Sequence, residues 1–290
     1  MWRQGMYSLA YLTVNGADPI EHIAAAAEAG YQAAGLRILQ PRHLADAPSV
    51  VGNVPLVRAI KRACSDSGIL LLDAEVMSIT PTTAWSEMQA VVDVAAELGF
   101  RFIQTVVEDP EEQRAADRVA ALADLAAAAD ARIALEFMRF RALTDLQSAM
   151  RLIQQVGRPN VQVLIDALHL ARSGGTPEQV ATLATNSIAL AQLCDAPAEA
   201  PATDLLPQEA RTARLYPGDG ALPLSGLLDV LPDGTPLSIE IPNTAYESLD
   251  FTARAKRALD ATDALCRARR LGSTNIDIDQ KMYRNRCKEV

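Results

Sequence analysis

Acidic and amide side chains stand at the ends of several apolar runs in this 290-residue chain. Glu136 lies in RIALEF, and Asp166 closes VQVLID. Gln192 and Glu240 interrupt SIALAQLC and PLSIEI in the same way. A carboxylate among buried apolar residues is costly unless it is paired or bound to a metal. Three carboxylates brought close together would also repel one another, and a divalent cation is the simplest means of holding them ionised. The four residues are therefore a candidate set of metal ligands.

A histidine follows one of these carboxylates closely. His169 lies about one helical turn beyond Asp166, and the chain has only 3 histidines. The oxygen atoms of the four candidate ligands favour Mn²⁺ or Mg²⁺, whereas a histidine nitrogen among them would make room for Co²⁺ or Zn²⁺. His169 could instead cap a helix. We expect it at the same site, with one divalent cation as the cofactor.

Short apolar runs alternate with longer helical patterns along the chain. Strands are predicted at 6–14, 31–38, 69–76, 101–107, 132–137, 161–166, 187–194 and 236–241. Helices are predicted near 18–29, 54–67, 83–98, 111–129, 143–156, 176–184, 222–231 and 247–270. Continuous apolar strands are typical of a parallel sheet that is buried on both faces. Eight strand–helix units predict an α/β fold, a single (β/α)8 TIM barrel over residues 1–271. No GxGxxG follows the first strand, which disfavours a doubly wound dinucleotide fold.

The barrel explains how residues so far apart in the sequence can act together. The carboxyl ends of its strands converge on one mouth, where the active sites of this fold are built. The candidate ligands come from four consecutive strands. Arg37 and Glu75, at the ends of the second and third predicted strands, are expected at the same mouth as groups that bind substrate.

Two stretches depart from the alternation of strands and helices. Residues 194–220 are rich in proline and alanine and longer than an ordinary connection, which indicates a functional loop or a disordered insertion. Residues 272–290 are polar, mixed in charge and without helical periodicity. They are predicted to be a tail outside the barrel, which could be frayed, in contact with another subunit, or a remnant of cloning.

The charge and the cysteines limit the class of protein. The formal net charge is −9, whereas a protein that binds nucleic-acid phosphates needs a basic face. The 4 cysteines are scattered without a CxxC pair, and no signal peptide or membrane-length apolar run is visible. We therefore expect a cytoplasmic protein with reduced thiols that acts on a small molecule. No nucleic-acid or membrane partner is expected, and a homo-oligomer is left open.

Five motifs, taken in order, resemble those of a known family. They are ALEFM (134–138), LIDALHL (164–170), QLCDAP (192–197), PGDG (217–220) and LSIEIP (237–242). The series is similar to the xylose isomerase-like TIM-barrel superfamily, and specifically to its sugar phosphate isomerases and epimerases. The likeness extends over nearly the whole chain.

The resemblance implies roles for individual residues. It implies one metal ion held by Glu136, Asp166, position 192 and Glu240. It also implies that His169 touches the substrate. An arginine after the seventh strand often binds a substrate hydroxyl or phosphate in this family, and Arg211 and Arg214 are the candidates here.

Two departures from the family bear on the reaction. Position 192 is Gln where epimerases usually carry His, and the Glu-Asp-Gln-Glu set resembles that of barrel dehydratases similar to 3-dehydroshikimate dehydratase. A carbonyl oxygen still binds a hard cation, so metal binding is expected to survive. Arg37 stands where sugar isomerases often carry an acid, and Arg139 and Arg141 add positive charge near the mouth. Arginines bind carboxylates and phosphates through paired hydrogen bonds, which favours an anionic substrate.

These observations predict an enzyme. The first expectation is a metal-dependent isomerase or epimerase of a small sugar, sugar phosphate or sugar acid that works through an enediolate. Glu136 and Glu240 are the expected acid–base pair, and His169 could protonate a leaving hydroxyl. The alternative is a lyase that dehydrates a cyclic polyhydroxy keto acid. A non-catalytic barrel or a relative of endonuclease IV is less favoured, because four ligands are retained and the chain is acidic and poor in histidine.

Overall fold

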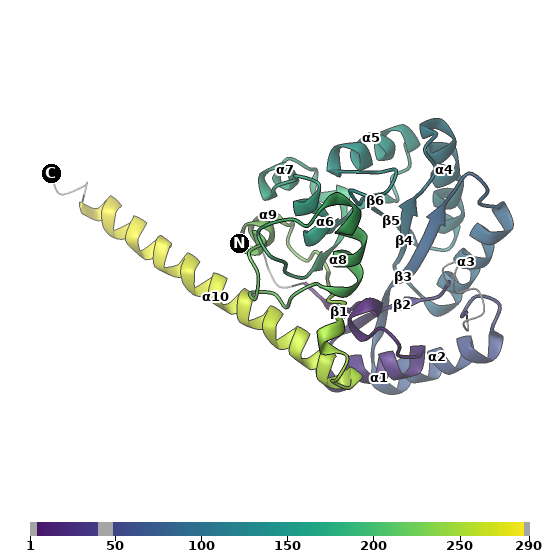
Figure 1. Cartoon of the computed structure of the whole chain (residues 1–290), viewed down its shortest axis with the longest axis horizontal. Helices are drawn as coiled ribbons and strands as arrows, with labels where there is room; N and C mark the ends of the chain where they lie inside the picture. The colour runs from purple at the N-terminus through teal and green to yellow at the C-terminus, as the bar shows by residue number, and fades with distance from the viewer. Residues whose placement is uncertain (1–4, 40–48, 287–290) are drawn as a thin grey trace.

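The computed structural model describes residues 5–39 and 49–286, with side chains as far as residue 269. Eight parallel strands form a closed barrel in chain order, and β8 pairs with β1 to close it. The strands are β1 (Tyr7–Leu9), β2 (Ala33–Arg37), β3 (Leu70–Ile79), β4 (Phe102–Val107), β5 (Arg132–Glu136), β6 (Val161–Asp166), β7 (Ile188–Leu193) and β8 (Leu237–Ile239). Figure 1 shows helices surrounding this barrel. The predicted α/β fold with a single TIM barrel is confirmed.

The helices follow the predicted ranges, with two additions near the site. They are α1 (Pro19–Ala29), α2 (Val54–Ser67), α3 (Trp85–Leu98), α4 (Glu112–Ala128), α5 (Leu146–Val156), α6 (Ala167–Arg172), α7 (Pro177–Ala181), α8 (Leu206–Thr212), α9 (Leu224–Val230) and α10 (Phe251–Arg286). Short 3-10 turns are η1 (Tyr11–Val14), η3 (Thr185–Ser187), η4 (Thr203–Leu205) and η5 (Thr244–Tyr246). The additions are α6, which starts directly after β6, and α8, which lies within the stretch 194–220. That stretch is therefore an ordered part of the fold.

The last helix differs most from the prediction. α10 continues past the predicted end near residue 270 and projects from the barrel in Figure 1. The sequence from 271 to 286 contains one glycine, Gly272, and no proline, so no strong helix breaker ends it. The predicted boundary between barrel and tail thus lies inside a helix, and residues 287–290 lie outside the described residues. Within the described ranges, no helix is both long and apolar enough to cross a membrane.

Two apolar layers hold the barrel together. The larger one lies between strands and helices and includes Ile103, Ile133, Val163 and Leu193, each fully buried. A smaller cluster is separate from it and contains Leu72, Phe102, Ala134, Leu164 and Leu190, among others. Both β5 and β6 carry a residue of this smaller cluster two positions before their terminal carboxylates. The polar strand ends are thus built on apolar strand segments.

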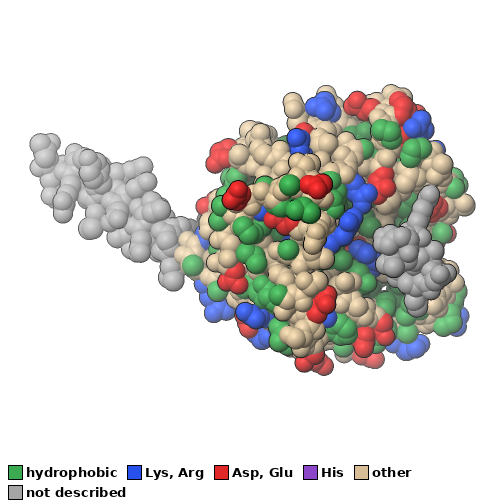
Figure 2. All heavy atoms as spheres, viewed as in Figure 1, with side chains coloured by type: hydrophobic (Ala, Val, Ile, Leu, Met, Phe, Trp, Pro, Cys, Tyr) green, Lys and Arg blue, Asp and Glu red, His purple; other side chains and the backbone are tan. Residues whose placement is uncertain are grey.

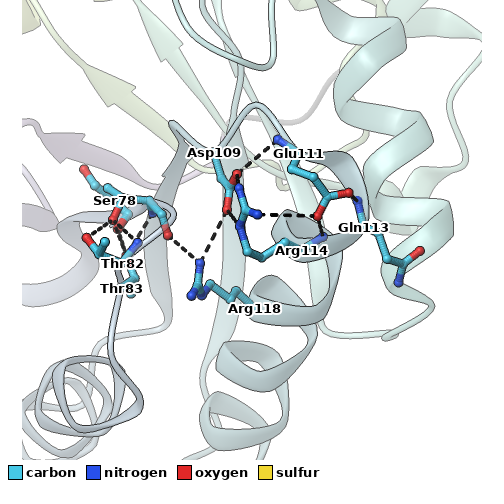
Figure 3. Close-up of polar contacts among 9 residues, drawn as sticks. Ser78, Thr82, Thr83, Asp109, Glu111, Gln113, Arg114 and Arg118 are labelled. Atoms are coloured by element: carbon cyan, nitrogen blue, oxygen red, sulfur yellow. Dashed lines mark hydrogen bonds and ion pairs between the residues drawn. The ribbon is translucent and has the colours of Figure 1, made fainter.

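A buried carboxylate fastens two loops at the mouth of the barrel. Asp109 is 2% exposed, and Figure 3 shows Arg114 and Arg118 converging on it. Arg114 Nε donates to Asp109 Oδ2 at 2.6 Å, and Arg118 Nη1 donates to the same oxygen at 3.4 Å. Arg118 also donates to the carbonyl oxygen of Thr80 at 2.8 Å. The start of α4 is thereby tied to the loop between β3 and α3.

Asp109→Asn is expected to make the protein less stable to urea at neutral pH. The hydrogen bond from Arg114 holds the pKa of Asp109 below its usual value, although burial opposes this. A carboxylate with a lowered folded-state pKa adds stability above its unfolded pKa of about 3.9, and that stability is lost as the pH falls through the folded value. Urea unfolding of both proteins from neutral pH down to about pH 3 should show the difference shrinking. A difference that is constant over this range would contradict the assignment.

Candidate metal and substrate site

The four predicted ligands come from four neighbouring strands. Glu136 and Asp166 are the last residues of β5 and β6, Gln192 is the penultimate residue of β7, and Glu240 directly follows β8. Each is at most 3% exposed. Asp166 is the register partner of Gln192, so their side chains emerge side by side. The structure therefore places the four at the carboxyl end of one half of the barrel.

His169 lies in the same cluster. Ligand atoms of Glu136, Asp166 and His169 all lie within 4.8 Å of one another. His169 Nε2 is 3.7 Å from Glu136 Oε1, and its backbone N–H donates to Asp166 Oδ1 at 2.9 Å. This second bond places Asp166 as the N-cap of α6, which is why the strand passes into a helix without a loop. The imidazole and the ring of Phe140 pack in a T-shaped arrangement, with centroids 5.7 Å apart.

Arg214 lies directly against two of the candidate ligands. Its guanidinium, 2% exposed, donates to Asp166 Oδ2 at 2.6 Å and lies 2.9 Å from Glu240 Oε2. Its Nε donates to the carbonyl oxygen of Ala210 at 2.8 Å. The guanidinium thus contacts two candidate ligands, and its predicted role in binding substrate stays a prediction.

Burial dominates the electrostatics of the cluster. Burial, reinforced by the charges of Glu240 and Asp166, raises the pKa of Glu136 well above its usual value. Burial likewise raises the pKa of Glu240 to about 8, although Arg214 opposes the shift. For Asp166 burial is outweighed, mainly by Arg214, and the pKa is lowered. Burial lowers the pKa of His169 to about 4, so the imidazole is neutral at pH 7 and free to offer a lone pair.

The donor set fits a divalent cation. With Glu136, Asp166 and Glu240 all ionised, as a bound cation would favour, the guanidinium of Arg214 leaves two negative charges, which one divalent ion would balance. Gln192 donates from Nε2 to Glu240 Oε1 at 3.3 Å, while its own Oε1 is buried without a hydrogen-bond partner among the described residues. Buried carbonyl oxygens normally have a partner, and a hard cation is a suitable one. Glu136, Asp166, Gln192, Glu240 and His169 are the groups that could hold it.

Arginines surround the mouth above the cluster. Arg211 is exposed, and its pKa is lowered by partial burial and by the positive charges of Arg141 and Arg37. Arg141 Nη1 donates to Glu108 Oε1 at 2.6 Å, and Arg37 lies over the ring of Tyr11 at 4.5 Å. No carboxylate of the described residues lies in ion-pair contact with Arg211. Figure 2 shows Lys and Arg side chains gathered near the centre of one face of the molecule.

The remaining predicted substrate groups fall into two classes. Glu75 is 1% exposed, lies 3.8 Å from Arg37 and accepts the N–H of Tyr11 at 3.0 Å, so it joins the mouth as predicted. Arg139 is exposed, and no contact within the described chain joins it to the cluster. Its substrate role stays a prediction.

Two further buried groups, to which the sequence assigned no role, also lie near the site. Gln104 of β4 donates from Nε2 to Glu136 Oε2 at 2.9 Å and orients that carboxylate. Asp73 of β3 is fully buried, and neither of its oxygens has a partner among the described residues. Burial raises its pKa well above the usual value, with Glu75 and Glu240 adding to the shift. Gly35 makes room for it, because a Cβ there would lie 2.8 Å from both oxygens.

The chain is thus a closed parallel TIM barrel with a buried Glu-Asp-His group at its carboxyl end that could hold a metal ion. Residues 23–269 match the family described as xylose isomerase-like TIM barrel. The chain belongs to that family, which confirms the resemblance seen in its motifs.

The chain is similar to a curated relative with a stated activity and to solved structures with the same fold. The chain is 26% identical over 269 residues to a 3-dehydroshikimate dehydratase of Pseudomonas aeruginosa, and this match covers 86% of the chain but only 40% of the relative. Two solved structures share the fold. The IolI protein, whose structure contains a zinc atom, has a TM-score of 0.76 at 17% identity over 90% of this chain and 98% of its own. D-Psicose 3-epimerase from Clostridium cellulolyticum H10 has a TM-score of 0.67 at 16% identity over 90% and 99%.

Proposed function

We propose that the protein is a divalent-metal-dependent lyase that removes water from an anionic polyhydroxy keto acid of the 3-dehydroshikimate class. The observation that carries this proposal is the group of arginines at the mouth, Arg37, Arg141 and Arg211, above a buried cluster of carboxylates. Arg141 is paired with Glu108 and Arg37 lies 3.8 Å from Glu75, but Arg211 has no ion-pair partner among the described residues. A carboxylate-bearing substrate would supply one, whereas a simple ketose carries no charge for it to bind. The dehydratase relative and Gln192 in the ligand set support the same choice.

The site residues suggest which group would carry out each step of the dehydration. A divalent cation held by the strand-end ligands would polarise the substrate carbonyl and acidify the adjacent C–H. His169, neutral and beside Glu136, can take the proton from that carbon and then return it to the β-hydroxyl, which leaves as water. The imidazole is neutral again after each turnover. This differs from the expectation that His169 enters the reaction as an acid.

The isomerase or epimerase reading remains the second candidate. It was the first expectation from the sequence, and the solved epimerase structure with the same fold keeps it open. Glu136 and Glu240 would then be the acid–base pair. Their buried positions on β5 and after β8 suit groups that act from two sides of a bound substrate.

A substrate screen separates the two candidates. The protein, supplied with Mn²⁺, is incubated with 3-dehydroshikimate and related keto acids and, separately, with ketohexoses and ketopentoses. The lyase predicts a product that is lighter by one water, detected by mass spectrometry. An isomerase predicts a product of unchanged mass and altered retention. Turnover of ketoses alone would overturn the lyase proposal.

Arg211→Gln is expected to weaken substrate binding without changing metal affinity. Losing one charge-assisted contact to an anion costs about 1.5–3 kcal/mol, or roughly 10- to 150-fold in KM. Steady-state kinetics with the substrate found in the screen measure the effect. Arg151→Gln, on α5, is the control and should leave KM unchanged. An unaltered KM in Arg211→Gln would remove this residue from the substrate site.

A further inference from the structure

The buried guanidinium of Arg214 joins two parts of the molecule that are distant in sequence. On one side it donates to Asp166, 48 positions away, and lies 2.9 Å from Glu240. On the other side its Nε donates to the carbonyl oxygen of Ala210, which lies in α8. The candidate ligands and the end of α8 therefore share one side chain. A displacement of either one would therefore strain the contacts of Arg214.

α8 also carries the arginine proposed to bind substrate. Arg211 lies in its last turn, three residues before Arg214. The opposite side of the helix is held by Glu209, which pairs with Arg172 of α6 at 2.7 Å. Arg172 donates in addition to the carbonyl oxygen of Pro197 at 2.9 Å. The backbone just after the helix is also bonded to Pro242 and Asn243. Of the two side-chain ties, only the one through Arg214 contacts the ligand carboxylates directly.

The ion pairs of Arg214 with Asp166 and Glu240 are costly to break because they are buried. A buried ion pair that loses one partner leaves an uncompensated charge, which is far more costly than losing a surface pair. Arginine suits this position because its planar group presents five donors in a fixed geometry, so it can bond two carboxylates and a carbonyl together. Lysine, a single point charge, cannot make all three contacts.

We propose that Arg214 is a positioning residue that couples the ligand cluster to α8, so that occupation of the metal site and the placement of Arg211 depend on each other. A cation that binds Asp166 and Glu240 changes the partners of Arg214, and Arg214 transmits this change to the helix. The consequence for substrate rests on the proposed function. The mechanical link between carboxylates and helix does not.

Hydrogen exchange with mass spectrometry tests the link in chelated protein. We compare the wild type, Arg214→Met, Arg214→Lys and the control Arg172→Met. In Arg214→Met the amides of residues 203–216 should exchange about tenfold faster or more, which corresponds to about 1.4 kcal/mol of lost local stability. Protection in β2 to β5 should be retained, and Arg214→Lys should be intermediate. If Arg214→Met unfolds globally, the exchange rates of Arg214→Lys over residues 203–216 are the test of the link. Wild-type exchange over 203–216 in Arg214→Lys, or in a folded Arg214→Met, would overturn the proposal.

Addition of Mn²⁺ then tests the coupling. In the wild type and in Arg172→Met, Mn²⁺ should change the exchange rates of α8. In Arg214→Met and Arg214→Lys this response should be lost or reduced, even though Arg172→Met also loosens the helix. An α8 response that survives in Arg214→Met would overturn the coupling. Failure of Mn²⁺ to bind the wild type would instead reject the proposed function. The hydrogen-exchange comparison in chelated protein would still show whether Arg214 connects the carboxylates to α8.

Discussion

Glu136→Gln is expected to lower turnover by about 10³-fold or more, because stabilisation of a developing oxyanion by a metal is worth several kcal/mol and each 1.36 kcal/mol is tenfold in rate. The substitution removes a carboxylate from the centre of the cluster, where it lies 3.7 Å from His169. It preserves the shape of the side chain, so the hydrogen-bonding position beside Gln104 remains filled. The rate with the substrate identified in the screen is the measurement.

The control for this variant is a carboxylate of the same type away from the mouth. Glu97→Gln removes a surface ion pair with Lys61 and should leave turnover unchanged. Thermal melting of all three proteins in chelator shows whether the fold is intact. Near wild-type turnover in a folded Glu136→Gln would exclude Glu136 from the reaction.

Asp195→Ala should lower the free energy of unfolding by about 3 kcal/mol or more, since each buried donor left without an acceptor costs about 1–3 kcal/mol. Asp195 is 2% exposed and accepts the N–H groups of Ala196, Gly218 and Leu222, each at 2.9 Å. It therefore holds together the start and end of the loop that contains α8.

Urea unfolding, followed by circular dichroism, measures the loss. Asp204→Ala is the matched control, because Asp204 is an exposed carboxylate in the same loop. Its removal should change stability by less than about 0.5 kcal/mol. If Asp195→Ala and Asp204→Ala unfold at the same urea concentration as the wild type, the loop is not held by Asp195.

Local sequence signals were sufficient for the barrel and for its acidic strand ends. A carboxylate that ends an apolar run, as Asp166 does, indicates where a strand ends. In a barrel it also indicates a polar residue at the carboxyl end of the strands, and both can be inferred from the sequence. The strand order follows because consecutive strand–helix units close in chain order. The position of Gln192 beside Asp166 is a direct consequence of that order.

The contacts of the long loop could not be predicted in the same way. Arg214 lies in irregular chain, and no periodicity indicates that it turns inward to meet Asp166 rather than outward to meet a ligand. Gln104 lies inside a strand, where a polar residue without a neighbouring motif gives no sign of its partner, Glu136. The sequence predicts an early end for α10 because hydrophobic periodicity stops near residue 270. A helix that projects from the barrel has no apolar face to bury, so it can continue without that periodicity.

The central claim is that the strand-end cluster binds one divalent cation. Calorimetric titration of chelator-treated protein with Mn²⁺ tests it most directly, because it needs no substrate. The account predicts one ion per chain for the wild type and for Glu97→Gln, and clearly weaker binding by Glu136→Gln, which keeps a carbonyl oxygen but loses the charge of one ligand. Absence of binding to the wild type, or equal binding by Glu136→Gln, would contradict it.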